Sequence, residues 1–164
     1  MPEYRILIYG YGNPGRQDDG LGNAFVERME QWVRQQAIED IEFDSNYQLN
    51  IEDSIAIADK DLVIFVDASV EEEIDDFALT RVKGTSDVAF TTHAASPGYV
   101  FKLCQDLYNK SPATLLLHIK GYEWSFTEGL TDAAEKNLEA AMAFLKEKLG
   151  NPEELINYVE TENK

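Results

Sequence analysis

The stretch ILIYGYGNPGRQDDGLG, residues 6–22, decides the fold, and it admits two incompatible interpretations. Its apolar start is typical of a buried strand, and its glycines then spell G-x-G-x-x-G, the fingerprint of a dinucleotide-binding loop. The same loop places Asp18 and Asp19 side by side where a helix is expected to begin. The loop therefore binds either an anionic phosphate or, through its carboxylates, something positive.

The phosphate interpretation conflicts with the charges of the loop. A dinucleotide-binding loop uses backbone N–H groups and a helix N-terminus to bind pyrophosphate, which the carboxylates of Asp18 and Asp19 would repel. Pro14 removes one N–H, and Asp44, the best candidate for the ribose-binding acid, lies about ten residues too late. We therefore interpret the glycines as turn residues and Asp18 as a helix cap, leaving Asp19 free to face a cleft. From this loop alone, ordinary helix capping and a functional role for the carboxylates both stay open.

Composition and charge restrict the class of protein. A chain of 164 residues is expected to form one domain, and its single cysteine, Cys104, excludes an internal disulfide and fits a reducing compartment. We expect a cytoplasmic monomer, because no signal peptide is visible and no apolar run approaches the ~20 residues of a membrane helix. The net charge of −17 argues against nucleic acid as a partner.

Strand-like and helix-like segments alternate along the chain, which predicts a three-layer α/β sandwich. The strands are expected at residues 4–9, 41–47, 62–66, 77–82 and 115–119, the fourth of them peripheral. The helices are expected at residues 19–37, 51–58, 97–109 and 132–149, the last two capped by Ser96 and Thr131. Residues 1–150 then form a single α/β domain, and residues 151–164 form a loosely held acidic tail.

Two further residues converge on the edge of the sheet where Asp19 is expected. Asp67 directly follows the apolar run 62–66, at the carboxyl end of a buried strand, where the ligand crevices of open α/β sheets lie. His93 is expected in the loop before the helix that begins near Pro97, over the same edge. Taken singly, Asp67 can cap a turn and His93 can be a surface residue. Together, two carboxylates and an imidazole suit a divalent transition metal with open coordination positions.

Three motifs, GNPGRQDDGLG, VIFVDA and THAASPG, resemble in their order and spacing those of the hydrogenase maturation endopeptidases. This family removes a C-terminal extension from the precursor of the NiFe-hydrogenase large subunit. The similarity covers residues 6–149, and GYEWSFTEGLT and the closing helix also resemble the family. It implies a twisted, mostly parallel five-stranded sheet flanked by helices, of the phosphorylase/hydrolase-like type.

The resemblance also implies the site and its substrate. The family's metal ligands, which are also its catalytic residues, correspond to Asp19, Asp67 and His93 of this sequence. Nickel is expected to be supplied by the precursor, where cysteines hold it, and other divalent metals can occupy the site in vitro. Hydrolysis would then use a metal-polarised carbonyl or metal-bound water, or one aspartate as general base. The partner that the resemblance implies is the large-subunit precursor.

One segment departs from the family pattern. After Asp67 the family often carries a stretch with glycine and proline, whereas this chain has ASVEEEIDDF, with five acidic residues between Glu71 and Asp76. The segment is either a solvated turn or an acidic rim that recognises basic residues of the precursor. We interpret His118 and Cys104 as wall or core residues. Two other functions stay open: a non-enzymatic nickel-sensing chaperone that uses the same three ligands, and a nucleotide-binding α/β enzyme.

Overall fold

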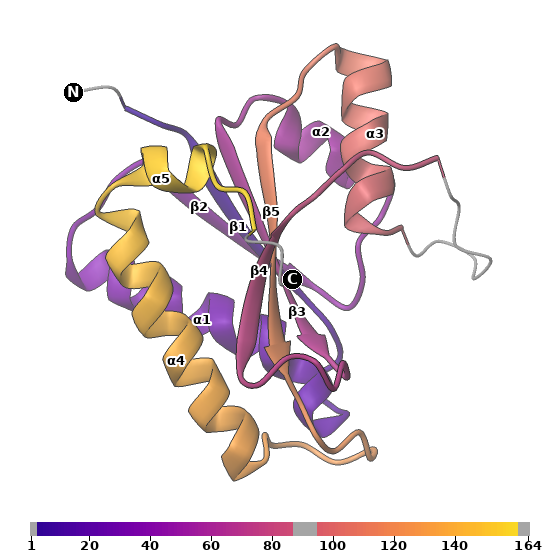
Figure 1. Ribbon diagram of the computed structural model, residues 1–164, viewed down its shortest axis with the longest axis vertical. Helices are drawn as coiled ribbons and strands as arrows, with labels where there is room; N and C mark the ends of the chain where they lie inside the picture. Colours follow the sequence, from indigo (N-terminus) through magenta and orange to yellow (C-terminus); the bar gives the residue numbers. More distant parts are fainter. Residues whose placement is uncertain (1–2, 87–94, 161–164) are drawn as a thin grey trace.

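The computed structural model describes residues 3–86 and 95–160. Its elements are β1 Ile6–Tyr11, the 3-10 helix η1 Gln17–Gly20, α1 Leu21–Gln35, β2 Ile41–Asn46, α2 Asp53–Ala58, β3 Leu62–Ser69, β4 Phe77–Arg81, α3 Pro97–Tyr108, β5 Ala113–Lys120, α4 Asp132–Leu149 and α5 Pro152–Ile156 (Figure 1). Each strand and helix expected from the sequence is present, with its ends shifted by a few residues. None of the helices in these described ranges is long and apolar enough to cross a membrane.

The five strands form one sheet in the order β2-β1-β3-β5-β4. β1 runs parallel to β2 and β3, and β3 runs parallel to β5. β4 lies at one edge and is antiparallel to β5, which confirms the peripheral strand. The apolar run Leu62–Val66 is buried over its whole length because helices cover both faces of a mostly parallel sheet. The α/β fold class is therefore confirmed.

Alternate residues of the central strands β1, β3 and β5 belong to two separate cores. Ile64 and Val66 of β3 belong to the larger core, which α1 and α4 cover on one face of the sheet (Figure 1). Val63 and Phe65 belong to the smaller core on the face of α2 and α3. Cys104 of α3 is fully buried in this smaller core, as the sequence predicted. This alternation decides on which face each side chain near the strand ends lies.

Residues 151–160 correct the expectation of a loosely held tail over 151–164, whose last four residues lie outside the described ranges. Residues of this segment form α5, and Leu155 is only 1% exposed because it packs into the larger core. The guanidinium of Arg81 in β4 donates from Nη1 to the carbonyl oxygens of Ile156 and Tyr158, at 2.9 and 3.1 Å. These contacts hold the segment against the edge strand β4 and the larger core. They were not expected from the sequence because the segment is mostly polar and acidic.

The carboxyl ends of β1, β3 and β5 meet at one edge of the sheet, the lower edge in Figure 1. The start of α1, the turn after β3 and the loop after β5 all lie at this edge. Backbone hydrogen bonds connect them: the N–H of Gly121 donates to the carbonyl of Ser69, and the N–H of Gln17 donates to the carbonyl of Thr127. Three segments that are far apart in sequence are thereby assembled around the carboxyl ends of the strands.

Candidate active site

The glycines between β1 and α1 allow close backbone contacts. Gly12 has a φ of +151°, and a Cβ on it would lie 2.0 Å from the carbonyl oxygen of Asp19. A Cβ on Gly22 would lie 2.4 Å from the carbonyl oxygen of Val66, so α1 begins directly against the end of β3. No L side chain fits either position without moving the backbone. The interpretation as a turn residue is confirmed for Gly12, whereas Gly10 lies in β1 and Gly22 lies in the first turn of α1.

The N–H groups of this loop serve the loop itself. The N–H of Asn13 donates to Oδ2 of Asp19 at 3.0 Å, and the N–H of Gly15 donates to Oδ1 of Asn13 at 2.9 Å. A phosphate would have to displace both acceptors, one of them a carboxylate. The geometry therefore disfavours the nucleotide-binding interpretation on the same ground as the sequence did.

Asp18 is fully buried, and its carboxylate accepts four hydrogen bonds. The donors are the backbone N–H groups of Tyr122 (2.7 Å), Glu123 (3.1 Å) and Thr131 (2.8 Å) and the hydroxyl of Thr131 (2.9 Å). The expectation that Asp18 caps its own helix is wrong: neither η1 nor α1 has a side-chain cap. A 3-10 turn precedes α1 and directs the Asp18 carboxylate inward, where it fixes the loop after β5.

Asp19 lies half-buried beside Asp18 but has a different environment. Among the described residues, its carboxylate accepts one hydrogen bond, the bond from the N–H of Asn13. The carbonyl oxygen of Asp19 packs closely against Gly12, and the backbone of Asp19 is part of the 3-10 helix η1. The carboxylate is therefore well placed by the backbone and still has acceptor capacity for an external ligand.

Asp67 lies on the face of the sheet that α2 and α3 cover, where β3 extends three residues beyond the apolar run 62–66. Burial raises its pKa to about 7, the backbone N–H of Ala68 opposes this shift, and the charge of Asp19 adds to it. The hydroxyl of Tyr11 donates a hydrogen bond that also lowers the pKa of Asp67. Since the charge of Asp19 contributes to the raised pKa of Asp67, the two predicted carboxylates lie within electrostatic range of each other.

His93, the third predicted ligand, lies outside the described residues. Within residues 3–86 and 95–160, no group of three or more His, Cys, Asp or Glu side chains is arranged to hold a metal ion. The ligand set of Asp19, Asp67 and His93 thus stays a prediction. The chemistry of the two described donors fits a cation, since a divalent ion would replace the proton of Asp67 and relieve the repulsion between two carboxylates.

Tyr11 is a site residue that sequence reasoning missed. Burial and the neighbouring Asp67 both raise the pKa of its hydroxyl, so Tyr11 remains a hydrogen-bond donor. The signal was present in the alternation of β1, because Leu7 and Tyr9 belong to the smaller core and Tyr11 packs against it. Tyr11 therefore donates to the Asp67 carboxylate from the neighbouring strand, on the same face of the sheet.

His118 pairs in register with Asp67 on the neighbouring strand β5. Its Nε2 lies 2.9 Å from the hydroxyl of Thr80 in β4, and burial lowers the pKa of its imidazole. His118 is therefore a neutral, half-buried residue that connects two strands, as the interpretation of a wall residue predicted.

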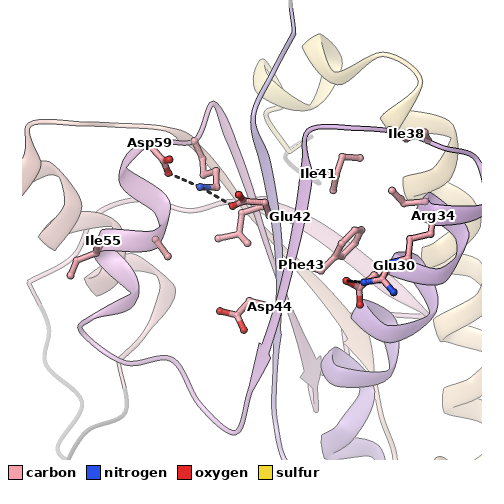
Figure 2. A pocket seen from close by; sticks show the side chains of 13 residues that line it. Glu30, Arg34, Ile38, Ile41, Glu42, Phe43, Asp44, Ile55 and Asp59 are labelled. Carbon is pink, nitrogen blue, oxygen red and sulfur yellow. Dashed lines mark hydrogen bonds and ion pairs between the residues drawn. The ribbon is translucent and has the colours of Figure 1, made fainter.

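A large groove of about 840 Å³ runs along the edge strand β2, away from the carboxyl ends of the strands (Figure 2). Charged groups in it pair with one another: Arg34 lies 3.2 Å from Glu30, and Lys60 lies 3.0 Å from Glu42. Figure 2 shows Glu30 and Arg34 side by side on one wall of the groove. Neither Asp19 nor Asp67 lines this groove. We therefore place the candidate site at the carboxyl edge of the sheet.

Comparisons with known proteins agree with the fold. No protein-family model and no curated protein sequence matches the chain. The structure of the NiFe-hydrogenase maturation protease HycI from Thermococcus kodakarensis is similar, with 24% identity and a TM-score of 0.72 over 90% of this chain and 94% of that one. The hydrogenase maturating endopeptidase HybD from Escherichia coli has 22% identity and a TM-score of 0.65, over 90% and 93% of the two chains.

A third similar structure is the solution structure of an endopeptidase from Escherichia coli. It has 20% identity and a TM-score of 0.70, again over 90% of this chain and 93% of its own. At these identities the comparisons establish a shared fold along nearly the whole chain.

Proposed function

We propose that this protein is an endopeptidase that removes the C-terminal extension from the precursor of a NiFe-hydrogenase large subunit. The observation that carries the proposal is the pair Asp19 and Asp67 at the carboxyl edge of a fold shared with hydrogenase maturation proteases. Three motifs with the family's order and spacing contain these two residues and His93. We place the reaction in the cytoplasm, where a monomer meets the precursor before hydrogenase assembly.

The proposed substrate is the nickel-loaded form of the precursor. Asp19, Asp67 and His93 would contribute donors to a nickel ion that the precursor already holds through cysteines. Three side chains make an incomplete coordination shell, so binding is strong only when the substrate adds the other ligands. Bound nickel would supply Lewis-acid activation of the scissile carbonyl or of water.

The side chains around the site have separable tasks in this proposal. The N–H of Asn13 orients Asp19, and the hydroxyl of Tyr11 orients Asp67. Asp67 has a pKa of about 7 in the free protein, so it exchanges a proton near neutral pH. It therefore either releases that proton on binding the metal or accepts one from water as a general base.

The test is incubation of the purified protein with nickel-loaded and with nickel-free precursor, followed by mass spectrometry of the precursor's C-terminus. We expect the nickel-loaded form alone to be shortened. Binding of the nickel-loaded form without shortening would replace the proposal by a nickel-sensing chaperone. Equal cleavage of both forms would keep the endopeptidase and reject nickel recognition. The Asp19→Asn variant serves as the control for a contaminating protease.

A further inference from the structure

The segment between β5 and α4, residues 121–131, forms a loop beside the candidate site. We call it the aromatic loop because it carries Tyr122, Trp124 and Phe126. Asp18 holds the loop at both ends, since its buried carboxylate accepts the N–H of Tyr122 at 2.7 Å and the N–H of Thr131 at 2.8 Å. The two ends of the loop are thereby joined through one side chain.

The middle of the aromatic loop is held by the two residues that precede Asp18. The N–H of Gln17 donates to the carbonyl of Thr127 at 2.8 Å. The guanidinium of Arg16 donates from Nη2 to the carbonyl of Trp124 at 3.1 Å. The loop and the turn that carries Asp19 therefore form one hydrogen-bonded unit, and a group on the loop has a fixed position relative to Asp19.

The aromatic loop nevertheless presents apolar surface to solvent. The side chain of Phe126 is 85% exposed, with the Arg16 guanidinium 4.9 Å from the centroid of its ring. Tyr122 is 41% exposed. Val70 is 68% exposed and directly follows Ser69, whose carbonyl accepts the N–H of Gly121 at the start of the loop. One exposed apolar side chain is ordinary, but these three lie on two segments that the hydrogen bond between Gly121 and Ser69 joins, so together they offer apolar surface to a partner.

The surroundings of this apolar surface are acidic. The exposed residues 71–73 belong to the acidic segment 71–76, and the N–H of Lys120 donates to the carbonyl of Asp76 at 2.9 Å. The acidic segment therefore lies directly beside the start of the aromatic loop. Two cations lie nearby and already have contacts: Lys120 lies 5.9 Å from the centroid of Tyr122 and 3.5 Å from the carbonyl oxygen of Glu72, and Arg16 lies over Phe126. An occupant must thus offer an apolar group and positive charge.

We propose that the aromatic loop and the acidic segment 71–76 form the docking surface for the stretch of the precursor that flanks the scissile bond. The inference rests on the proposed function. The occupant is an extended peptide segment with an apolar side chain that covers Phe126 and Lys or Arg side chains that face the acidic segment. Its affinity comes from the apolar contact, and the charges raise its association rate and specificity.

The first experiment replaces Phe126 by alanine and measures cleavage of nickel-loaded precursor over a range of concentrations. We expect KM to rise about tenfold with kcat unchanged, because the side chain binds substrate and touches no reacting atom. Leu107→Ala in α3 is the matched control, since Leu107 is 62% exposed and lies at the end of α3 that leads into the amino end of β5. Thermal unfolding should be unchanged in both variants, as both side chains are largely exposed.

The second experiment replaces Glu72 and Glu73 by glutamine and follows KM as the salt concentration rises. For the wild-type protein we expect KM to increase with salt, and for the double variant we expect a flatter dependence. Suppose that the wild type cleaves the precursor, that F126A keeps the wild-type KM, and that the double variant keeps the wild-type salt dependence. The docking surface is then refuted, whereas the proposed endopeptidase activity stands. If the wild type cleaves no precursor, the proposed function itself fails.

Discussion

Asp18 and Asp19 are adjacent in sequence, but they serve two regions with opposite properties. Asp18 lies in a closed region, where four donors from residues 122–131 fill the hydrogen-bonding capacity of its carboxylate. Asp19 lies with Asp67 in a second region, which we call the open region because the acceptors of these carboxylates are only partly filled: within residues 3–86 and 95–160, Asp19 accepts from Asn13 and Asp67 accepts from Tyr11 and Ala68. A carboxylate whose acceptors are filled builds structure, whereas one that is placed but unfilled is available for chemistry.

The largest expected effect concerns the open region. Replacing Asp19 or Asp67 by asparagine removes a proposed nickel donor, so cleavage of nickel-loaded precursor should fall more than about 100-fold. The measurement is the initial rate of precursor shortening, with circular dichroism to show that each variant is folded. A rate within threefold of the wild type, on the order of 0.7 kcal/mol, would remove that residue from the site.

The closed region should respond in stability. Asp18→Asn places an amide among backbone N–H donors and leaves buried groups unpaired, so the free energy of unfolding should fall by about 3 kcal/mol. Urea unfolding followed by circular dichroism measures this change. Asp19→Asn is the matched control, and we expect it to lose less than about 1 kcal/mol. If the free energy of unfolding fell equally in the two variants, Asp18 would have no greater structural role than Asp19.

The raised pKa of Asp67 makes the free energy of unfolding depend on pH. Its folded pKa of about 7 lies above the usual value of 3.8, so the folded state keeps its proton longer than the unfolded state does. Stability therefore falls as the pH rises between these two values, and the full penalty is present above the folded pKa. Asp67→Asn cannot ionise, so its stability relative to the wild type should rise by about 2 kcal/mol between about pH 5.5 and pH 8.

Urea unfolding of both proteins at the two pH values gives this difference directly. Other groups that titrate in the range are common to wild type and variant, so their contributions cancel. A relative stability that stays constant with pH would show that Asp67 is already ionised at the lower pH and is less desolvated than the structure indicates.

The smallest expected effect concerns Tyr11. Tyr11→Phe removes the hydroxyl that donates to Asp67, and this should cost about 1 kcal/mol at pH 8, where Asp67 is ionised, and less at pH 5.5. Tyr9→Phe is the matched control on the same strand, because the Tyr9 hydroxyl donates to Asp53 at 3.0 Å and not to Asp67. If both variants show the same pH dependence, Tyr11 has no specific role toward Asp67.

Local patterns in the sequence were enough to predict the elements and the open region. Ser96 and Thr131 cap α3 and α4 as expected, since each accepts an N–H three residues ahead. Asp67 was chosen as a candidate because an apolar strand of a parallel sheet ends near the edge where ligands bind, and its position at the end of β3 is confirmed. These inferences depend on residues close together in the chain, or on a rule that places every strand end at the same edge.

The role of Asp18 could not be predicted in this way. Its partners lie more than 100 residues downstream, in a loop whose conformation has no local signature. The packing of α5 was missed for a related reason, because Leu155 is a single anchor within an acidic segment. The prediction for His93 stays untested, since His93 lies outside the described residues.

The most direct measurement of the central claim is nickel K-edge X-ray absorption on the nickel-loaded precursor, alone and mixed with this protein. If Asp19 and Asp67 are open donors for the nickel of the substrate, the sulfur-containing nickel shell should gain oxygen or nitrogen neighbours on mixing with the wild type. The double variant D19N/D67N should produce no such gain. An identical nickel shell in the presence and absence of the wild-type protein, under conditions where the complex forms, would contradict the account.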